Sequence, residues 1–342
     1  MRPGGPAKLA DVARRAGVST ATVSRCLNAP DRVQSDTRKR VLAAVAELGY
    51  APNFSARALA ARQTFTIGAV IPTMENAIFA RGIQAFQEAL AGLGYTLLIA
   101  SSSYREALEE EQIRTLVAHG SDGLLLIGHH RQARIRDMLR DRGIPALVAW
   151  SHDAGGGGLP AIGFDNEAAM ARLADAVLAR GHRRLGTISA ETAANDRARD
   201  RVRGIRRAMG AAGLDPDDLA VVETPYGFET GAAAFRALMV RPGPPSAVLC
   251  GNDVLAVGAL REAHRLGLRV PDDVSITGFD DTELATLVDP PLTTVHVPHR
   301  EMGRRGAEML VEMVTEKRLG AESVELATEL VLRETLGAAG GA

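Results

Sequence analysis

Residues 17–28, GVSTATVSRCLN, place small polar side chains and one long cation at helical spacing. Val18, Val23 and Leu27 fall on one side of such a helix, where a core would bury them. The opposite side carries small residues and one arginine: Thr20, Ala21, Thr22 and Arg25. A helix face built from small residues allows close approach to another surface, so this segment predicts a contact surface.

Arg25 has the most specific chemistry in this segment. A guanidinium donates two parallel hydrogen bonds to O6 and N7 of guanine, which is worth about 1–3 kcal/mol of discrimination. Thr20 and Ala21 suit thymine methyl groups or a base edge. Three further hydroxyl groups are better placed for phosphates: Ser19, Thr22 and Ser24. Duplex DNA is therefore the predicted partner; the alternative is a small bundle whose surface helix binds nothing.

The elements around this face agree with DNA binding. A short amphipathic helix is predicted before Gly17 from apolar residues at helical spacing: Leu9, Val12, Ala13 and Ala16. Ser19 is the expected N-cap of the helix at about 20–28. A third helix follows Ser35 and ends at Gly49, with four residues predicted to face inward: Val41, Leu42, Val45 and Leu48. The first two helices form a helix-turn-helix, whose second helix enters the major groove.

The charge distribution separates this segment from the rest of the 342 residues. Residues 1–62 carry 11 basic and 4 acidic side chains, whereas the remaining 280 carry 29 and 37. Only the N-terminal segment therefore suits a polyanion. Cys26 and Cys250 lie in regions of different character, and we see neither a signal peptide nor a membrane-spanning run. These features predict a cytoplasmic protein of two or three domains.

The segment KLADVARRAGVSTATVSRCLNAPDRVQSDTRKRVLAAVAELGYAPNFSARALAARQT resembles the headpiece of the lac/galactose repressor family nearly position by position. Cys26 departs from the aliphatic residue usual there. The resemblance implies a headpiece over 1–51 and a hinge over 52–64, whose short helix orders on the DNA minor groove. Leu59 would then be the wedge at the central base step. The expected DNA-contacting residues are Ser19, Thr20, Ala21, Thr22, Ser24, Arg25, Asn28, Asn53, Arg57 and Leu59.

From Phe65 the pattern changes to short apolar runs that alternate with helical stretches. The predicted buried parallel strands are FTIGAVIP, YTLLIASS, GLLLIG, PALVAW, RRLGTISA, LAVVETP, SAVLCG and SITGFD. Two such series predict an α/β body of two doubly wound lobes. TTVHV, a helix at about 299–318 and SVELATELVLRET add one more unit.

The family's body is periplasmic-binding-protein-like, and the resemblance implies three chain crossings, near 162–164, 290–293 and 320–324. Residues 65–336 would then form the effector-binding and dimerisation domain. Its N-lobe would comprise about 65–162 and 293–320, its C-lobe about 163–291 and 321–336, and a flexible tail would follow over 337–342. A ligand cleft is expected between the lobes, at the C-terminal ends of their strands.

The family match implies these effector-binding residues: Asn76, Ile78, Phe79, Trp150, Ser151, Arg197, Arg201, Tyr226, Asn252, Asp253 and Asp280. Such a set suits a sugar or sugar acid, because carboxylates accept from hydroxyls and arginine grips a carboxylate or diol. AIGFDNEAAM resembles the gluconate-operon repressor branch. Ordinary structural roles remain open. Asp280 and Asp281 could cap the following turn, and Arg201 could pair with Asp200 or with glutamates on a solvated helix. Phe79 could be core, and Asn252 with Asp253 could cap a helix.

The resemblance implies a homodimeric repressor of a near-palindromic operator, or less often an activator, in which effector binding changes the lobe angle. The chain shows no heptad tail, so we expect no coiled-coil tetramer. The alternatives are a solute-binding protein or an enzyme on the same scaffold. We find no GxGxxG, GxxxxGK[ST], GxSxG or HExxH motif, and His129-His130 lack partners at metal-ligand spacing. We therefore predict no catalytic residues, metal or cofactor.

Overall fold

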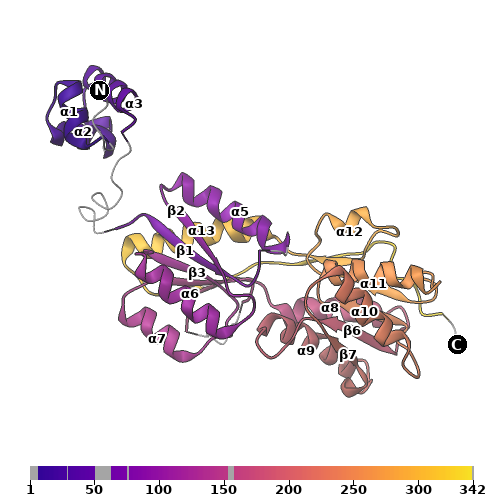
Figure 1. The fold of residues 1–342 in the computed structure, drawn as a ribbon. Coiled ribbons are helices and arrows are strands. Elements are labelled where there is room, and N and C mark those ends of the chain that lie inside the picture. The colour runs from indigo at the N-terminus through magenta and orange to yellow at the C-terminus, as the bar shows by residue number, and fades with distance from the viewer. Residues whose placement is uncertain (1–6, 29, 51–62, 75–76, 153–157, 341–342) are drawn as a thin grey trace. The chain divides into compact units, whose positions relative to one another are not determined.

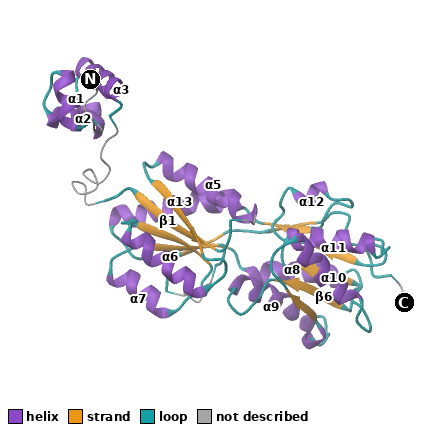
Figure 2. Cartoon of the chain, viewed as in Figure 1, coloured by secondary structure: helices purple, strands orange, loops and turns teal. Residues whose placement is uncertain are grey.

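The computed structural model describes residues 7–28, 30–50, 63–74, 77–152 and 158–340. The chain forms two compact units, Met1–Thr64 and Phe65–Ala342. Figure 1 colours the chain from its N-terminus to its C-terminus, and Figure 2 shows the helical first unit and the mixed helix and strand content of the second. No helix in the described ranges combines the length and apolar character needed to cross a bilayer.

The first unit contains the three predicted helices, α1 (Leu9–Ala16), α2 (Thr20–Asn28) and α3 (Ser35–Leu48), with a 3-10 turn at Pro30–Arg32 between α2 and α3. Gly17 ends α1 with φ 64°, a left-handed conformation that glycine adopts without strain. The side chains of Val12, Val23 and Val41 are fully buried and hold the helices together.

One expected core residue of the first unit is exposed. Leu42 is 45% exposed, although we expected it to face inward. The inward stripe of α3 instead follows Val41, Ala44, Val45 and Leu48. Leu42 lies about 100° around the helix from Val41, outside that stripe.

The first lobe of the second unit is built on a parallel sheet with strand order β11-β5-β4-β3-β1-β2. Its strands are β1 (Thr66–Ile71), β2 (Thr96–Ser101), β3 (Gly123–Ile127), β4 (Ala146–Ala149), β5 (Ala161–Gly163) and β11 (Val324–Glu325). Helices cover both faces: α5 (Ala77–Gly92) and α13 (His299–Glu316) on one, α6 (Glu106–Ala118) and α7 (Ala133–Asp141) on the other.

The second lobe has a four-stranded parallel sheet with strand order β7-β6-β8-β9. Its strands are β6 (Leu185–Ser189), β7 (Ala220–Glu223), β8 (Ala247–Cys250) and β9 (Ser275–Thr277). The helices of this lobe are α8 (Asn166–Leu178), α9 (Asp196–Ala211), α10 (Phe228–Met239), α11 (Asp253–Arg265) and α12 (Leu284–Leu287), with a 3-10 turn at Pro216–Asp218. The predicted pair of doubly wound lobes is thus confirmed.

Two expectations for the body are wrong. We assigned residues 321–336 to the C-lobe, but Val324–Glu325 pairs with β5 in the first sheet, so the last crossing follows Glu325. The chain then forms an antiparallel ribbon of β10 (Thr294–His296) and β12 (Glu329–Val331). We also expected β2 to be buried. Leu98 and Ile99 are instead 37% and 38% exposed, because β2 is an edge strand with a neighbour on one side only.

Candidate functional site

The outward face of α2 presents the predicted DNA-contacting residues of the first unit. Ser19, Thr20, Ala21 and Arg25 are exposed, whereas Thr22 and Ser24 are partly buried. Val23 and Cys26 are buried on the opposite side, at 0% and 2% exposure, and fix the helix against the core. A cysteine in this position therefore acts as a small apolar residue.

Ser19 caps α2, as its position in the sequence predicts. Its Oγ accepts a hydrogen bond from the backbone N–H of Thr22 at 3.1 Å and lies 2.9 Å from Thr22 Oγ1. The cap stabilises the first turn of the helix, which carries Thr20 and Ala21. Four predicted residues lie outside the described residues: Asn53, Arg57, Leu59 and Asn76. Asn28 ends α2, but its side chain also lies outside them.

A cavity of about 580 Å³ lies between the two lobes of the second unit. Residues from the turns after β1 and β2 line one side, and residues from the turns after β6 and β7 line the other. The lining residues are Thr73, Met74, Ser101, Ser103, Tyr104, Arg105, Ala190, Glu191, Ala194, Asn195, Pro225, Tyr226 and Val254. The cavity is therefore at the C-terminal ends of parallel strands, where open α/β sheets bind ligands.

Among the predicted effector residues that the structure describes, Tyr226 alone lines this cavity. Its ring faces Tyr104 of the first lobe, with centroids 6.0 Å apart and planes inclined by 49°. Burial raises the pKa of both phenols, so both stay neutral. Sequence reasoning missed Tyr104 and Asn195. The available signal was that each residue belongs to the turn that follows a parallel strand.

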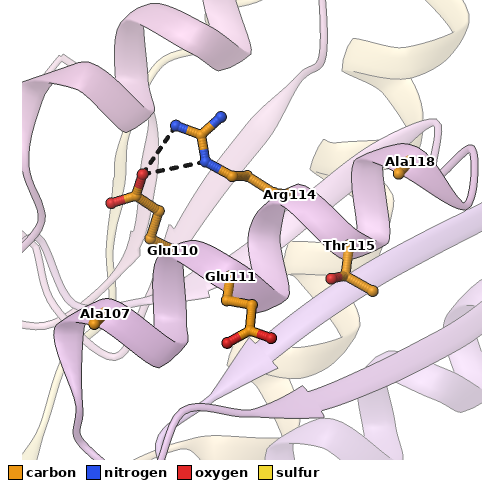
Figure 3. Close-up of a pocket in the computed structure, with 6 residues that line it drawn as sticks. All are labelled: Ala107, Glu110, Glu111, Arg114, Thr115 and Ala118. Atoms are coloured by element: carbon orange, nitrogen blue, oxygen red, sulfur yellow. Dashed lines mark hydrogen bonds and ion pairs between the residues drawn. The ribbon is translucent and has the colours of Figure 1, made fainter.

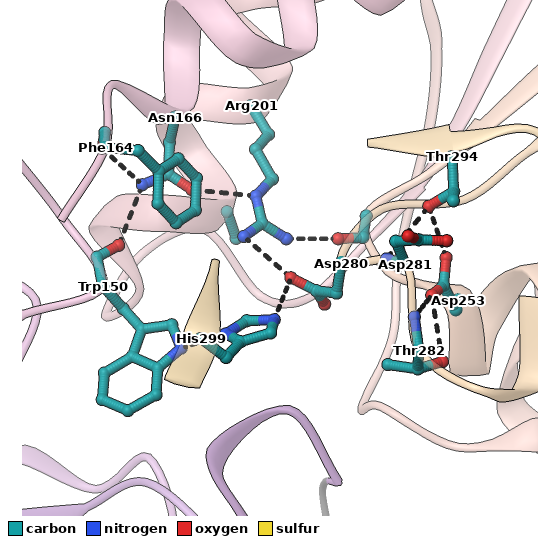
Figure 4. Close-up of polar contacts among 12 residues, drawn as sticks. Trp150, Phe164, Asn166, Arg201, Asp253, Asp280, Asp281, Thr282, Thr294 and His299 are labelled. Carbon is teal, nitrogen blue, oxygen red and sulfur yellow. Dashed lines mark hydrogen bonds and ion pairs between the residues drawn. The ribbon is translucent and has the colours of Figure 1, made fainter. Parts of the chain in front are cut away.

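A buried polar network joins the lobes (Figure 4) and is centred on Arg201 of α9. Arg201 Nε donates to Asn166 Oδ1 at 2.9 Å, and Nη1 donates to the carbonyl oxygen of Gly251. The guanidinium carbon lies 3.8 Å from the ring centroid of Phe279. Arg201 does not pair with Asp200, which instead contacts Arg203 at 3.0 Å. The alternative in which Arg201 pairs with Asp200 on a solvated helix is therefore wrong.

Asp280 faces Arg201 without being hydrogen-bonded to it. Its Oδ1 lies 3.8 Å from Arg201 Nη2, and neither carboxyl oxygen has a hydrogen-bond partner in the described part of the chain. The residue is 1% exposed, with a backbone φ of 103°. Burial raises the pKa of Asp280 to about 8, against the opposing effect of Arg201. A neutral carboxyl group both donates and accepts, which suits a ligand hydroxyl.

His299, the first residue of α13, approaches the same carboxyl group from the first lobe. Its Nδ1 lies 3.1 Å from Trp150 Nε1, which can only donate. Burial lowers the pKa of His299 to about 3, so the ring is neutral and its proton is on Nε2. Nε2 lies 3.8 Å from Asp280 Oδ1 and has no hydrogen-bond partner among the described residues. His299 therefore offers a hydrogen-bond donor next to the carboxyl group of Asp280, which can both donate and accept.

Asn252 and Asp253 have structural partners. Asn252 Oδ1 accepts from the backbone N–H of Leu255 at 2.9 Å and caps α11, while its buried Nδ2 has no partner in the described chain. Asp253 accepts from the backbone and hydroxyl of Thr282, at 2.6 and 3.0 Å, and from Thr294 Oγ1 at 2.7 Å. These bonds hold the turn after β9 against β10. Both oxygens of Asp253 are therefore occupied by protein partners, whereas we expected them to bind the effector.

The remaining predicted effector residues in the described ranges are buried and do not line the cavity. Phe79 is 2% exposed and packs edge-on against Trp150 at 5.4 Å, so it belongs to the core with Ile78. Ser151 is also buried. Arg197 Nη1 is engaged by Asp196 Oδ1 at 2.9 Å.

A second hollow runs along α6 (Figure 3) and does not resemble a ligand site. All its lining residues belong to this one helix: Ala107, Glu110, Glu111, Arg114, Thr115 and Ala118. Arg114 Nη2 already pairs with Glu110 at 2.9 Å. A ligand there would meet groups from a single element, unlike in the cleft between the lobes.

Comparisons with known proteins cover both units. The pattern of the family described as bacterial regulatory proteins, lacI family, matches residues 8–53, and a periplasmic binding protein-like domain matches residues 174–336. The HTH-type transcriptional regulator GntR of Pseudomonas aeruginosa is 35% identical over 319 residues, which cover 93% of this chain and 92% of GntR.

Two solved structures extend the similarity to the fold. The lac repressor dimer bound to operator and the anti-inducer ONPF is 27% identical, with a TM-score of 0.86 over 98% of this chain and 100% of that chain. The transcriptional regulator CelR in complex with cellobiose is 30% identical, with a TM-score of 0.70 over 96% and 99%. This chain therefore belongs to the lacI family of bacterial regulatory proteins and is a DNA-binding transcriptional regulator controlled by a small effector.

Proposed function

We propose that the protein is a homodimeric repressor of a near-palindromic operator, with α2 of each headpiece in a major groove. The observation that supports this most strongly is the exposed face of α2. On this face small residues precede one long cationic side chain, Arg25, and the other side of the helix is buried. In this arrangement Arg25 reads a guanine, while Thr20 and Ala21 approach base edges.

We propose that residues 52–64 act as the hinge between headpiece and body. By the family's pattern Leu59 wedges the central minor-groove step, and Asn53 and Arg57 lie near phosphates or groove edges. Unstacking a base step costs a few kcal/mol, and the contacts to bent DNA offset that cost. Effector binding then controls whether the hinge helices of the two protomers form together.

We propose that the effector is a hydroxyl-rich small molecule bound in the cavity between the lobes, a sugar or sugar acid. Tyr104 and Tyr226 line this cavity and offer apolar ring faces. Asp280, His299 and Asn252 do not line it, but each carries a buried polar atom without a hydrogen-bond partner in the described chain, which a ligand reaching that depth would satisfy. The buried guanidinium groups of Arg197 and Arg201 already have protein partners. Asp196 compensates the charge of Arg197, whereas Arg201 meets only neutral partners while Asp280 is protonated. A sugar hydroxyl and the carboxylate of a sugar acid both suit this guanidinium.

For effector binding to control DNA binding, the protein must bind the effector with different affinities in its two lobe arrangements. A hundredfold difference shifts the equilibrium by about 2.7 kcal/mol. We further propose that the protein acts in the cytoplasm and releases its effector chemically unchanged. Of the alternatives, an enzyme would convert the small molecule, and a solute-binding protein would show no sequence preference on DNA.

The test begins with selection of duplexes from a random library by the purified full-length protein. We expect a near-palindromic consensus, and enrichment of no sequence would overturn the repressor proposal. A thermal-shift comparison of D-glucose with D-gluconate, and of D-ribose with D-ribonate, then tests the effector class. Stabilisation by the acids alone would identify the effector class as sugar acids, stabilisation by the sugars alone as neutral sugars, and stabilisation by none of them would contradict the proposed class. Asp280→Asn should abolish a stabilisation seen with the wild type.

A further inference from the structure

The first turn of α9, from the second lobe, contacts the turn after β3, from the first lobe. The backbone N–H of His129 donates to Asp196 Oδ2 at 2.5 Å. Asp196 Oδ1 in turn accepts from Arg197 Nη1 at 2.9 Å. The side chains of Asp196 and Arg197 are only 7% and 9% exposed. An ion pair is thus buried at a boundary that the two lobes share.

Gly128 allows this close contact. Its φ is 71°, and a Cβ atom added there would lie 1.9 Å from Arg197 Nη1 and 2.4 Å from Asp196 Oδ1. Both separations are far below van der Waals contact, and both atoms belong to the second lobe. A larger residue at position 128 would therefore clash with the ends of the Arg197 and Asp196 side chains and displace the ion pair from the turn after β3.

The same contact adjoins the cavity between the lobes. Asn195 lines that cavity and caps α9 by accepting from the backbone N–H of Ala198 at 3.3 Å. Tyr104 and Ala194 line the cavity and also border a water-sized space of about 20 Å³ beside Asp196 and Arg197. The cavity and the ion pair are therefore joined by directly neighbouring residues.

The charge state of Asp196 suits a contact that persists at neutral pH. Burial acts to raise the pKa of Asp196, but the charge of Arg197 and the His129 N–H outweigh it and hold the pKa below its ordinary value. The carboxylate is therefore ionised and accepts strongly from both partners. A buried pair is a weak source of net stability, so its placement in α9 against the turn after β3 of the other lobe indicates a conformational role.

We propose that Asp196, Arg197, Gly128 and His129 form an interlobe latch that holds the lobes closed and sets how readily they separate. Control of the latch by the effector rests on the proposed effector site, whereas the latch itself does not. The amide of His129 reports on it directly, because separation of the lobes breaks its hydrogen bond to Asp196.

The experiment measures hydrogen–deuterium exchange of the His129 amide in the full-length protein without effector or DNA. Gly128→Ala should accelerate this exchange at least tenfold. Gly143→Ala is the matched control, because Gly143 has a similar φ of 65° in the same lobe and an added Cβ meets nothing within 4 Å. Equal acceleration in both variants would assign the effect to backbone strain and overturn the latch.

A second pair of variants removes the carboxylate instead of adding a methyl group. Asp196→Ala should accelerate His129 exchange, whereas Asp200→Ala should not, because Asp200 pairs with Arg203 within α9. Protection of the Leu124–Leu126 amides in β3 verifies that the first lobe stays folded. Wild-type exchange at His129 in both Gly128→Ala and Asp196→Ala would contradict the proposal. The exchange measurements use no effector. Failure of the latch proposal therefore leaves the proposed effector site undecided, and failure of the effector screen leaves the latch undecided.

Discussion

The recognition helix α2 and the cleft between the lobes use arginine in opposite ways. Arg25 is exposed on a helix that presents its functional side chains to solvent. Arg201 is 5% exposed and donates to Asn166 and Gly251, beside the carboxyl group of Asp280. The exposed arginine is free to be replaced at little cost in stability. The buried arginine organises its surroundings, so its replacement should affect folding before it affects binding.

The largest expected effect follows from this difference. Arg201→Met should lower the free energy of unfolding of the body by about 3–5 kcal/mol, because it removes the charged partner of a buried network. Arg25→Met should change it by less than about 0.5 kcal/mol. Urea unfolding followed by the fluorescence of Trp150, the single tryptophan, measures this difference. Equal stability of the two variants would remove the organising role of Arg201.

Arg25→Ala tests the exposed side of the comparison. Affinity for the selected duplex should fall by about 1–3 kcal/mol, because the bidentate bonds to guanine are lost. Affinity for a scrambled duplex should fall less, since that binding depends mainly on phosphates. Fluorescence anisotropy with both duplexes at equal salt concentration measures the two losses. If they are equal, Arg25 contacts phosphate and does not read a base.

Asp280 predicts a pH dependence that belongs to the cleft alone. Its pKa is raised to about 8 in the folded protein, from an ordinary value of 3.8. Between pH 6.5 and 8 the unfolded chain has lost this proton and the folded protein retains it, so stability falls as pH rises. The slope is at most about 1.4 kcal/mol per pH unit. Asp280→Asn should flatten it in urea unfolding, and an unchanged slope would place the titration elsewhere.

The smallest expected effect concerns the cap of α2. Ser19→Ala should destabilise the headpiece by about 1 kcal/mol, because the Thr22 N–H loses the Ser19 Oγ acceptor. Circular dichroism at the helical minimum follows the loss, while Trp150 fluorescence should report an unchanged body. A stable headpiece in this variant would show that the turn after Gly17 positions α2 without the cap.

The two regions also differ in how far the sequence predicts them. The helices of the headpiece follow from local features: apolar spacing, Gly17, and the Ser19 cap. The lobes follow from alternating apolar runs, and the turns at strand ends correctly mark where a cleft forms. Local features fail for Leu42 and for the last crossing, because both depend on how elements pack across the fold.

The individual cleft residues were harder to predict, since the approach of one lobe to the other decides their roles. Tyr104 meets Tyr226 from a distant part of the chain, and its only local signal is its place in the turn after β2. Asp253 has the residue type of a ligand contact, yet Thr282 and Thr294 occupy its oxygens. His299 gains its role only because Trp150 fixes its tautomer.

The most direct test of the whole account measures duplex binding by the purified full-length protein over a range of salt concentrations. A duplex selected from the random library competes with a scrambled duplex of the same composition. We predict a preference of at least about 10³ for the selected sequence, the lower end for specific regulators. Equal binding to both duplexes at every salt concentration would contradict the assignment of α2 as a reader of sequence.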